Sequence, residues 1–576
     1  MDLLPHLIET VASEQPEAVA IDGPRGALSY GELLGRTRTF AGLLRELGAA
    51  PGEVVAVEGA GTPAAVTALT GALYAGCVIL PIDPALSPEL RDTMIDAARA
   101  RFLVRADDGE WRVSDPGRRV PLPDRPSPLA APAGLDPRAP AYVCFTSGST
   151  GRPKAVLGAH DSLAHFLRWQ RDTFEVGHGD RMAQLTSWSF DVVLRDLFTP
   201  LVSGATLCLP GSRSRDAERV FAFARTYAIT LLHVVPSLAR RWLAADAAQT
   251  GVPTLRVAFF AGEPLHTDLV GDWRRRVAPG SRVVNLYGPT ETTLAQCFYE
   301  VPPEPEAGPL PVGRTLPGCS ASVVRPGSWH PTSPGEPGEV VLTTPYRSLG
   351  YLGTGASTFA TTPAGEPAYR TGDVGRWDER GLLHLLGRLD QQVKVRGVRL
   401  RPPEVERVLR GVPGVREAAV VDAADEHGSV RLVGFLVAGP ALPPVRDLRE
   451  AIVRELPAAA VPDEFVLLTD LPLLPNGKVD RTDLREQAGT RAPAKPVDAP
   501  PGDGNALVVE TCRRVLGVEA VPVTADLFEL GVDSMSAMEI AARLEDLLGG
   551  EIPLGLVFDH PTVEDISRYL VHRGLA

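Results

Sequence analysis

The sequence has few cysteines and no excess of positive charge. Six cysteines are scattered along 576 residues, and none forms a Cys-x-x-Cys pair. This spacing suggests neither a zinc site nor a disulfide framework, and it fits a reducing cytosol. The formal net charge of −13 argues against general nucleic-acid binding, which needs clustered Lys and Arg. We therefore expect a cytoplasmic protein without a nucleic-acid partner.

The chain also lacks a long uninterrupted apolar run and a secretion signal. Its longest apolar stretch, 64–82, is interrupted by Thr67 and Gly71 and closed by Pro81 and Pro84. The first residues include acidic side chains and no basic start followed by an apolar segment. We expect a buried helix followed by a strand at 64–82, no membrane association and no export.

Local patterns along the chain predict an α/β protein of several compact units. At 576 residues the chain exceeds one ordinary domain, and its 44% apolar content is enough for real cores. Helical periodicity over 30–47 alternates with short β-branched runs such as 54–57 and 283–286. This alternation favours layered α/β structure with a mainly parallel sheet. The segment 489–504 is rich in Pro, Ala and Gly, which is typical of an interdomain linker.

A serine near the C-terminus stands at the start of an expected helix. It lies in the run Leu530-Gly531-Val532-Asp533-Ser534-Met535, and apolar residues follow at helical spacing. One interpretation is that Asp533 or Ser534 only caps this helix, as both residue types commonly do. The other is that Ser534 carries a covalent group. Because no His or Lys stands nearby in the sequence to activate the hydroxyl, a separate enzyme would attach that group.

A Gly- and hydroxyl-rich loop follows an expected strand at 141–145. Its sequence is Thr146-Ser147-Gly148-Ser149-Thr150-Gly151-Arg152-Pro153-Lys154. Backbone N–H groups and hydroxyls of such a loop can turn toward phosphate oxygens while the lysine supplies positive charge. The loop does not fit the Walker spacing, and Pro153 precedes its lysine. Taken alone, the loop predicts either a phosphate site or a flexible surface segment.

Further motifs follow this loop in order. They are Asn285-Leu286-Tyr287-Gly288-Pro289-Thr290-Glu291-Thr292, Tyr369-Arg370-Thr371-Gly372-Asp373, Gly387-Arg388-Leu389-Asp390 and Pro475-Asn476-Gly477-Lys478. Together with the loop they resemble the adenylate-forming superfamily, specifically the adenylation domains of nonribosomal peptide synthetases, over about residues 1–485. The residues around Ser534, namely Asp526-Leu527-Phe528-Glu529-Leu530 before it and Val557-Phe558-Asp559-His560-Pro561-Thr562 after it, resemble acyl and peptidyl carrier proteins.

The resemblance implies a fold, a division into domains and a reaction. The fold would be α/β, with a large adenylation core of layered α/β subdomains at 1–389 and a small α+β lid at 390–488. A linker at 489–504 and an all-α, four-helix carrier domain at 505–576 would follow. The reaction would be ATP-dependent activation of an amino acid as aminoacyl-AMP with release of pyrophosphate, then thioester loading of the carrier. Ser534 would hold the covalent 4′-phosphopantetheine arm, attached by a phosphopantetheinyl transferase.

The resemblance also assigns roles in nucleotide binding. Tyr287 would stack on adenine, Asp373 would bind the ribose hydroxyls and Arg388 would add a ribose or phosphate contact. Glu291 would help to hold Mg²⁺ together with the substrate phosphates. Lys478 would be the catalytic cation, brought in when the lid closes about a hinge at Asp390. Further ATP contacts would come from Thr146, Ser147, Gly148, Ser149, Thr150, Gly151, Lys154, Gly262, Glu263, Gly288 and Thr290.

The same alignment implies a pocket for the substrate. Asp191 resembles the residue that pairs with the α-ammonium group, which favours an amino acid over a plain carboxylic acid. Alternatively, Asp191 pairs with Arg195, four residues later on a helix. The pocket set resembles serine-activating pockets, but Arg195 replaces an aromatic residue, so an acidic or hydroxylated amino acid is expected, of α or β type. The other pocket positions are Val192, His233, Phe259, Ala261, Leu286, Leu294 and Ala295, with Lys478 at the far end.

Two other functions compete with this interpretation. An acyl-CoA ligase-like enzyme would share the nucleotide motifs and act on a non-amino carboxylic acid, but Asp191 and Ser534 argue against it. A catalytically idle nucleotide-binding module would be expected to lack some of the charged residues that this chain has. The segments around Ser534 look closer to polyketide carriers. We therefore expect condensation or ketosynthase partners on other chains, in a peptide or hybrid peptide-polyketide pathway of secondary metabolism.

Overall fold

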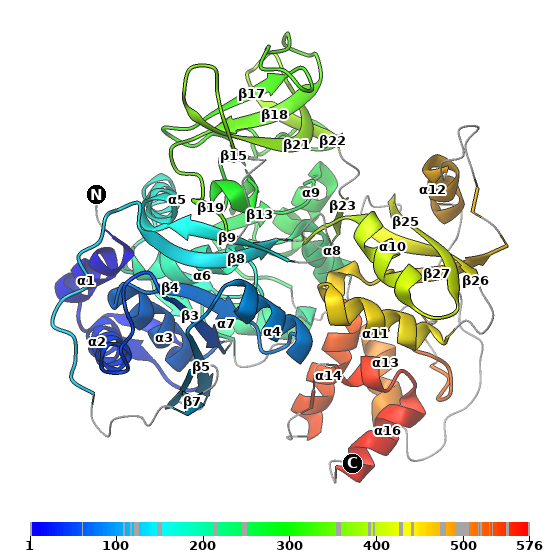
Figure 1. Cartoon of the computed structure of the whole chain (residues 1–576), viewed down its shortest axis with the longest axis horizontal. Helices are drawn as coiled ribbons and strands as arrows, with labels where there is room; N and C mark the ends of the chain where they lie inside the picture. Colours follow the sequence, from blue (N-terminus) through cyan, green and yellow to red (C-terminus); the bar gives the residue numbers. More distant parts are fainter. Residues whose placement is uncertain are drawn as a thin grey trace.

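The computed structural model shows a large α/β body with a lid and a small helical domain beside it (Figure 1). It describes residues 3–59, 61–107, 110–115, 118–119, 126–146, 153–210, 216–244, 250–352, 359–389, 393–395, 398–424, 430–438, 443–469, 471–472, 480–489, 506–516, 518, 521–528, 530, 532, 534–548, 552–553 and 555–573.

Two large sheets form the body. The first has nine strands. Six of them, β1 and β10 to β14, pair with one another in parallel. Its order is β16 (Arg314–Thr315), β15 (Cys297–Glu300), β14 (Arg282–Tyr287), β13 (Val257–Ala261), β12 (Leu231–Val234), β10 (Arg181–Ala183), β11 (Thr206–Cys208), β1 (Val19–Asp22) and β2 (Leu28–Ser29).

The second sheet is mixed and has eight strands. Strands β3, β4, β5 and β8 pair in parallel, and β9 returns antiparallel to β8. Its order is β19 (Gly350–Tyr351), β9 (Lys154–Ala159), β8 (Pro140–Thr146), β4 (Val78–Ile82), β3 (Val54–Glu58), β5 (Phe102–Asp107), β6 (Glu110–Asp115) and β7 (Arg118–Arg119). The expected helix and strand at 64–82 are α3 (Pro63–Tyr74) and β4, so this apolar stretch lies inside the body.

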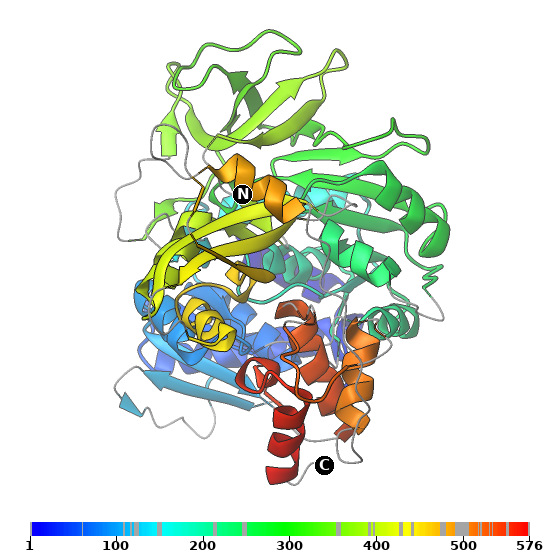
Figure 2. The same ribbon diagram turned by 90° about the vertical axis from the view of Figure 1, so that its right-hand side faces the viewer.

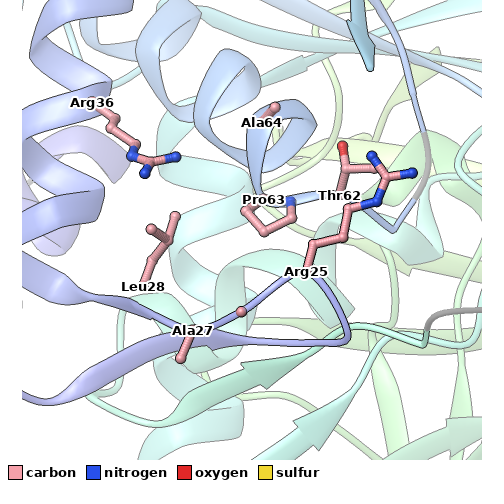
Figure 3. A pocket seen from close by; sticks show the side chains of 8 residues that line it. Arg25, Ala27, Leu28, Arg36, Thr62, Pro63 and Ala64 are labelled. Carbon is pink, nitrogen blue, oxygen red and sulfur yellow. The ribbon is translucent and has the colours of Figure 1, made fainter. Parts of the chain in front are cut away.

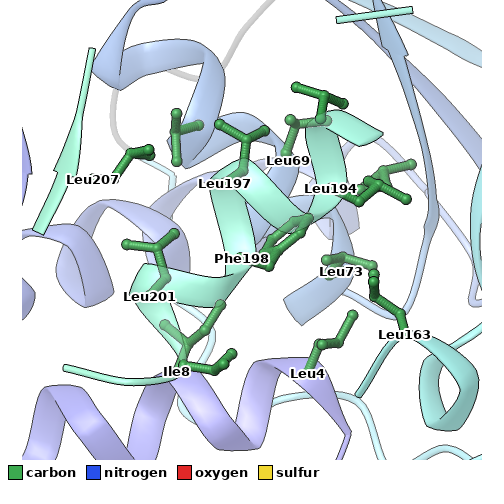
Figure 4. Packing of buried hydrophobic residues seen from close by; sticks show 14 of the residues in the cluster. Leu4, Ile8, Leu69, Leu73, Leu163, Leu194, Leu197, Phe198, Leu201 and Leu207 are labelled. Carbon is green, nitrogen blue, oxygen red and sulfur yellow. The ribbon is translucent and has the colours of Figure 1, made fainter. Parts of the chain in front are cut away.

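Helix α6 lies at the centre of the packing between the sheets. Its buried face consists of Leu194, Leu197, Phe198 and Leu201, which recur at helical spacing. Figure 4 shows these side chains packed among leucines and an isoleucine of α1, α3, α5 and β11. The body helices are α1 (Leu4–Glu14), α2 (Tyr30–Glu46), α3, α4 (Pro88–Ala97), α5 (His160–Thr173), α6 (Val192–Leu201), α7 (Ala217–Thr226), α8 (Pro236–Ala244) and α9 (Thr267–Arg276). This packing fixes the start of α6, where two of the expected substrate residues lie.

A third sheet covers one end of the body, at the top of Figure 1. It is antiparallel throughout, and β21 pairs on one side with β18 and on the other with β22. Its strands are β17 (Ser320–Val324), β18 (Gly338–Thr343), β20 (Phe359–Thr361), β21 (Pro367–Trp377) and β22 (Leu383–Arg388). The register sets Asp373 directly opposite Arg388.

The lid is a small α+β unit. It holds the hairpin of β23 (Val393–Val395) and β24 (Val398–Leu400) and a sheet in the order β25 (Val415–Ala424), β26 (Val430–Ala438) and β27 (Glu464–Leu468). Its helices are α10 (Pro402–Gly411), α11 (Val445–Glu455) and α12 (Arg481–Gly489). The buried carboxylate of Glu406 joins α10 to α12 through Arg481, 2.7 Å away, and accepts a hydrogen bond from the backbone N–H of Val420 in β25.

The carrier region is helical. Its described helices are α13 (Ala506–Leu516), α14 (Ser534–Leu548), α15 (Leu556–Asp559) and α16 (Val563–His572), and they enclose their own apolar cluster. Figure 2 shows these helices, orange to red, below the yellow lid. Helix α11 of the lid contacts both α4 of the body and α15 of the carrier. The expected fold class, α/β core with an α+β lid and a helical carrier, is confirmed.

No helix among the described residues is long and apolar enough to cross a membrane. All six cysteines lie within the described residues and are free thiols.

Candidate active site

The candidate residues gather at the C-terminal ends of β12, β13 and β14. These strands are adjacent and parallel, with His233 opposite Phe259 and Ala261 opposite Leu286 in the register. In open α/β sheets, ligands bind outside the carboxyl ends of the strands, because loops from successive strands meet there. The sheet therefore brings together residues that are up to about fifty positions apart in the sequence.

A buried polar network lies where the expected nucleotide residues meet. The carboxylate of Asp373, 4% exposed, accepts hydrogen bonds from the hydroxyl of Tyr287 and from Nη1 of Arg388, the latter at 2.6 Å. The Asp373 backbone N–H donates to Thr371 Oγ1 at 3.0 Å. Tyr287 ends β14, whereas Asp373 and Arg388 face each other on β21 and β22. The network thus ties the third sheet to the first and fixes the orientation of the carboxylate.

The segment after β14 is constrained at its backbone. A Cβ on Gly288 would lie 2.7 Å from the Cα of Ala295, so only glycine fits there. Thr290 and Glu291 follow in a short 3₁₀ turn, η1 (Thr290–Thr292), and Glu291 is 4% exposed. Thr293 and Leu294 both have positive φ, 65° and 62°. Positive φ costs a branched threonine about 1–3 kcal/mol, and such strain concentrates at functional sites.

Tyr351 joins the loop lysine to the expected metal residue. Its hydroxyl donates to Oε1 of Glu291 at 2.7 Å, and Nζ of Lys154 lies 5.3 Å from the centre of its ring. Strand β19 places Tyr351 beside β9, which begins at Lys154, and Lys154 pairs across the hairpin with Thr146. The sequence interpretation missed Tyr351, because a lone tyrosine outside the quoted motifs gave no signal.

The residues around Glu291 fit a magnesium ion held largely by substrate. Among the described residues, no cluster of three or more His, Cys, Asp or Glu is placed to hold a metal on its own. Mg²⁺ keeps most of its water and is usually bound by one or two carboxylates plus phosphates. Glu291 offers one buried carboxylate, and Tyr351 links it to Lys154, the last residue of the expected phosphate loop, which matches that pattern.

Asp191 lies at the start of α6, close to the same turn. Burial raises the pKa of its carboxyl, while a side-chain hydrogen bond with Thr290 and the charge of Arg195 act in the opposite direction. The preceding turn is held by Asp83, which follows β4 and accepts hydrogen bonds from Ser187 Oγ at 2.5 Å and from the Trp188 N–H at 3.3 Å. Asp191 thus lies beside Thr290 and Glu291, the residues expected to contact phosphate and metal.

Arg195 is paired differently from the sequence-based alternative. The ion pair that the structure gives it is with its neighbour Asp196, 3.9 Å from Nε, and not with Asp191. Nε of Arg195 is buried and has no hydrogen-bond partner among the described residues. Burial lowers the pKa of Arg195, while Asp196 and Asp191 favour its charged form. A guanidinium with an unused donor is thus enclosed in the expected side-chain pocket.

Asp196 also faces His233. Its Oδ1 lies 2.9 Å from His233 Nδ1, at an angle outside that of a hydrogen bond, and its Oδ2 accepts from Thr186 Oγ1 at 2.7 Å. Burial lowers the pKa of His233 to about 4, with a further lowering by Arg195. The imidazole stacks on Phe259 with centroids 4.7 Å apart. At neutral pH His233 is uncharged, and Asp196 and Arg195 neutralise each other.

A second layer supports the imidazole from behind. Nε2 of His233 lies 2.8 Å from Gln170 Nε2, and Gln170 Oε1 accepts from Thr199 Oγ1 at 2.8 Å. All three side chains are buried. Because Gln170 Nε2 donates, His233 Nε2 is the acceptor and Nδ1 carries the proton. Asp196, Gln170 and Thr199 were not found from the sequence, although buried polar residues on the apolar pattern of α5 and α6 were a usable signal.

Other predicted residues are placed as follows. Val192 begins α6, and Ala261, the last residue of β13, lies opposite Leu286, the last but one residue of β14. Gly262 follows β13 with φ 95°, a conformation that suits glycine, and Glu263 comes next. Ser534 is the first residue of α14. The predictions that fall on Ser147, Gly148, Ser149, Thr150, Gly151, Asp390 and Lys478 lie outside the described residues.

A separate recess of about 430 Å³ is lined by none of these residues. It lies between the β1–β2 turn, α2 and the start of α3, and Figure 3 shows Arg25 and Arg36 beside Thr62 and Pro63 there. Both arginines are exposed, so the recess presents solvated charge rather than an enclosed site.

Family comparisons cover three parts of the chain. Residues 8–352 match the family described as AMP-binding enzyme, and residues 404–478 match the AMP-binding enzyme C-terminal domain. Residues 506–570 match the phosphopantetheine attachment site family. The exact domain boundaries expected from the sequence stay predictions.

Individual proteins resemble the chain along nearly its whole length. Enterobactin synthase component F of Escherichia coli (strain K12) is 33% identical over 98% of this chain and 45% of its own length. Bacitracin synthase 3 of Bacillus licheniformis is 32% identical over 98% of this chain and 9% of its own length. The chain thus spans less than half of these relatives.

Solved structures share the fold. Holo-PA1221, a nonribosomal peptide synthetase protein containing adenylation and PCP domains, superimposes with a TM-score of 0.79 at 24% identity, covering 99% of this chain and 96% of that one. IdnL1 superimposes with a TM-score of 0.71 at 27% identity, covering 82% and 99%.

Proposed function

We propose that this chain, which belongs to the AMP-binding enzyme family and also has a phosphopantetheine carrier domain, activates an amino acid and loads its own carrier. The same two kinds of domain occur together in nonribosomal peptide synthetases. The family chemistry is that of a ligase that forms adenylates with ATP and Mg²⁺. The C-terminal domain is of the type that holds covalent 4′-phosphopantetheine, which requires a phosphopantetheinyl transferase.

The observation that carries the proposal is the position of Asp191 beside Thr290 and Glu291. In an α-amino acid, one carbon separates the ammonium group from the reacting carboxylate. A carboxylate that binds the ammonium must therefore lie within a few ångströms of the α-phosphate, near residues that contact phosphate and metal. A raised pKa at Asp191 also means that the arrival of an ammonium group relieves an unfavourable buried charge.

Adenylate formation in this site needs orientation and charge stabilisation. The substrate carboxylate attacks the α-phosphorus, the bond to the β-phosphate oxygen breaks, and pyrophosphate leaves with the bonding pair. Asp373, held by Tyr287 and Arg388, would orient the ribose. Glu291 would help to hold Mg²⁺, which would offset the negative charge of the substrate phosphates. We assign the compensating positive charge near the leaving group to Lys478 of the lid.

The charges of the buried pocket residues limit which amino acid can bind. Asp191 and Asp196 carry two negative charges, Arg195 carries one positive charge, and His233 is neutral above pH 4 to 5. The substrate's ammonium brings the sum over these four residues to zero, so a neutral side chain adds no further charge beside them. An acidic side chain would leave a net buried charge, which costs several kcal/mol. We therefore infer a small, hydroxylated amino acid that accepts a hydrogen bond from Arg195, rather than an acidic one.

The deciding experiment is ATP–pyrophosphate exchange across a panel of acids. The panel contains serine, threonine, alanine, aspartate, a β-amino acid and a matched 2-hydroxy acid that lacks the ammonium group. We expect exchange with a small hydroxylated amino acid and at least about 100-fold less with the 2-hydroxy acid, because Asp191 would remain buried without its partner. Exchange with carboxylic acids that lack an amino group, and with no amino acid, would support the acyl-CoA ligase-like alternative instead.

Two variants separate the half-reactions. Lys478→Ala should lose most exchange, because no other charge replaces the lysine in the transition state. Ser534→Ala should keep exchange and lose all covalent loading, measured as labelled amino acid retained on the protein. Labelled amino acid on Ser534→Ala protein would show that the carrier assignment is wrong.

The downstream partners follow from the carrier. Onward transfer of the loaded group from the carrier needs a condensation or ketosynthase activity. The sequence around Ser534 favours a polyketide or hybrid pathway. Incubating the loaded protein with candidate ketosynthase and condensation partners tests this point, and transfer only to condensation domains would contradict the hybrid pathway.

A further inference from the structure

A cluster of four charged residues joins the adenylation body to the carrier. Arg543 of α14 forms an ion pair with Asp216, the residue before α7, and lies 3.4 Å from Glu539 of its own helix. Arg219 of α7 interacts electrostatically with Asp216, Glu539 and Arg543. We call these four residues, Asp216, Arg219, Glu539 and Arg543, the α7–α14 charge cluster.

The α7–α14 charge cluster is buried by the contact between the two domains. Asp216 is 6% exposed and Glu539 is 7% exposed, and the Arg543 side chain is 16% exposed. A pair with the same spacing on α16, Glu564 and Arg568, shows the contrast, with side chains 51% and 65% exposed. The charges on α14 are therefore covered by the body, whereas those on α16 remain in solvent.

The lid supplies a second contact to the carrier. The guanidinium of Arg449 on α11 lies 4.1 Å from the centre of the Phe528 ring. Burial raises the pKa of Asp559 in α15, while the charges of His560 and of Arg446, on the same helix as Arg449, act in the opposite direction. This contact is a cation over an aromatic ring, which tolerates small rotations. The paired charges at α7 are more directional, because opposite signs must meet at fixed positions.

Helix α14 links the charge cluster to the attachment serine. Ser534 is its first residue, so at about 1.5 Å per residue Glu539 and Arg543 lie roughly 8 Å and 14 Å along the same rigid helix. Fixing these two side chains on the body fixes where the start of the helix lies. A carrier with like charges at these positions would meet Asp216 or Arg219 with repulsion, which is an effective way to reject a wrong partner.

We propose that the α7–α14 charge cluster is the element by which the body recognises its carrier for loading. The partner it fits is a carrier whose helix starts at the attachment serine and has an acidic residue five positions later and a basic residue nine positions later. This inference rests on the proposed loading reaction. It adds that recognition depends on charge complementarity between α7 and α14, separately from adenylate formation.

A charge exchange in the full-length holoprotein tests the proposal. Arg543→Glu places two carboxylates together, and we expect the single-turnover loading rate to fall at least about tenfold with unchanged pyrophosphate exchange. Asp216→Arg should have the same effect from the body side. It leaves the carrier sequence intact, and Asp216 makes no capping hydrogen bond to α7. The double variant should recover loading to within about threefold of the unaltered protein.

The controls separate recognition from folding and from the proposed function. Arg568→Glu, on the exposed face of α16, should load normally. Modification of Ser534 by the transferase, followed by mass spectrometry, reports that each variant carrier is folded. Normal loading by both single variants, or no recovery in the double variant, would overturn the proposal. Absence of both exchange and loading in the unaltered protein would instead contradict the proposed function.

Discussion

The nucleotide network and the side-chain pocket both use strand β14, but they satisfy their buried charges differently. Asp373 accepts hydrogen bonds from Tyr287 and Arg388, so its charge is paired at hydrogen-bond distance. Arg195 has its nearest carboxylate 3.9 Å away and a donor without a partner among the described residues. The first arrangement holds its geometry by itself, whereas the second gains a hydrogen bond when a polar substrate enters. A rigid network suits the nucleotide site, because ATP binds there whichever acid is activated.

The largest loss of activity is expected on substitution of Asp373, the centre of the nucleotide network. In Asp373→Ala, Arg388 remains buried without its carboxylate and the ribose contact is lost. Removing one partner of a buried pair costs about 3–5 kcal/mol, so kcat/KM for ATP should fall at least about 100-fold. Pyrophosphate exchange at varied ATP measures this. Asp378→Ala is the matched control, because Asp378 pairs with Arg380 in the same hairpin, where Arg380 is 54% exposed. Similar losses in both variants would contradict a special role for Asp373.

Acid should affect the side-chain pocket. Burial lowers the pKa of His233 to about 4, below the value of about 6.5 in an unfolded chain. The unfolded state therefore takes up a proton first as the pH falls. The contribution of His233 to stability is complete above about pH 6.5 and declines toward pH 4, by about 3 kcal/mol in total.

Denaturant unfolding of the body between pH 7 and pH 4.5, followed by tryptophan fluorescence, measures this dependence. His233→Gln should flatten the slope in part. His160, with a pKa also lowered to about 4 by burial, lies on α5 outside the described pocket contacts and should leave the remaining slope. An unchanged slope in His233→Gln would contradict the neutral buried imidazole.

A smaller effect is expected behind the imidazole. Thr199→Val removes the hydroxyl that donates a hydrogen bond to Gln170 Oε1, while the side chain keeps its shape. Loss of one buried hydrogen bond costs about 1–2 kcal/mol, and the amino-acid KM should rise several-fold with little change in the ATP KM. Thr39→Val is the control, because among the described residues the Thr39 hydroxyl donates only to the carbonyl of Gly35 in its own helix. Equal changes in both KM values would show that the two parts of the site are not separate.

The smallest effect is expected at Tyr351, which lies between Glu291 and Lys154. Tyr351→Phe loses the hydrogen bond to Glu291 and keeps the ring beneath Lys154, so it should cost about 1 kcal/mol, roughly fivefold. The loss should appear as a higher Mg²⁺ concentration for half-maximal exchange. Tyr351→Leu removes both contacts and should cost more. A loss in Tyr351→Phe that is independent of Mg²⁺ would argue against this role.

Much of the fold and the nucleotide site could be predicted from the sequence. The expected helix at 30–47 is α2, and the expected strands at 54–57 and 283–286 are β3 and β14. Tyr287, Asp373 and Arg388 stood in recognisable ordered motifs, and the structure brings them together. These residues form contiguous local sequences, so a single chain contains enough pattern to find them.

The side-chain pocket was predictable only in part. Arg195 and His233 were found, but their partners Asp196 and Gln170 lie on helices whose pattern is dominated by packing. The contact between Asp196 of α6 and His233 of β12 depends on the rotation of α6, which its apolar face sets against several other elements. The α7–α14 charge cluster could not be predicted from the sequence either, because docking of the carrier brings together residues more than 300 positions apart.

Helix α11 touches α4 of the body on one side and α15 of the carrier on the other. A change in lid position therefore alters the surface on which the carrier rests, and the two equilibria share a coupling free energy. By reciprocity, whatever strengthens carrier binding at α11 stabilises this lid position by the same amount. Occupancy of the nucleotide site and the state of the attached arm can then influence each other through one helix, without direct contact between them.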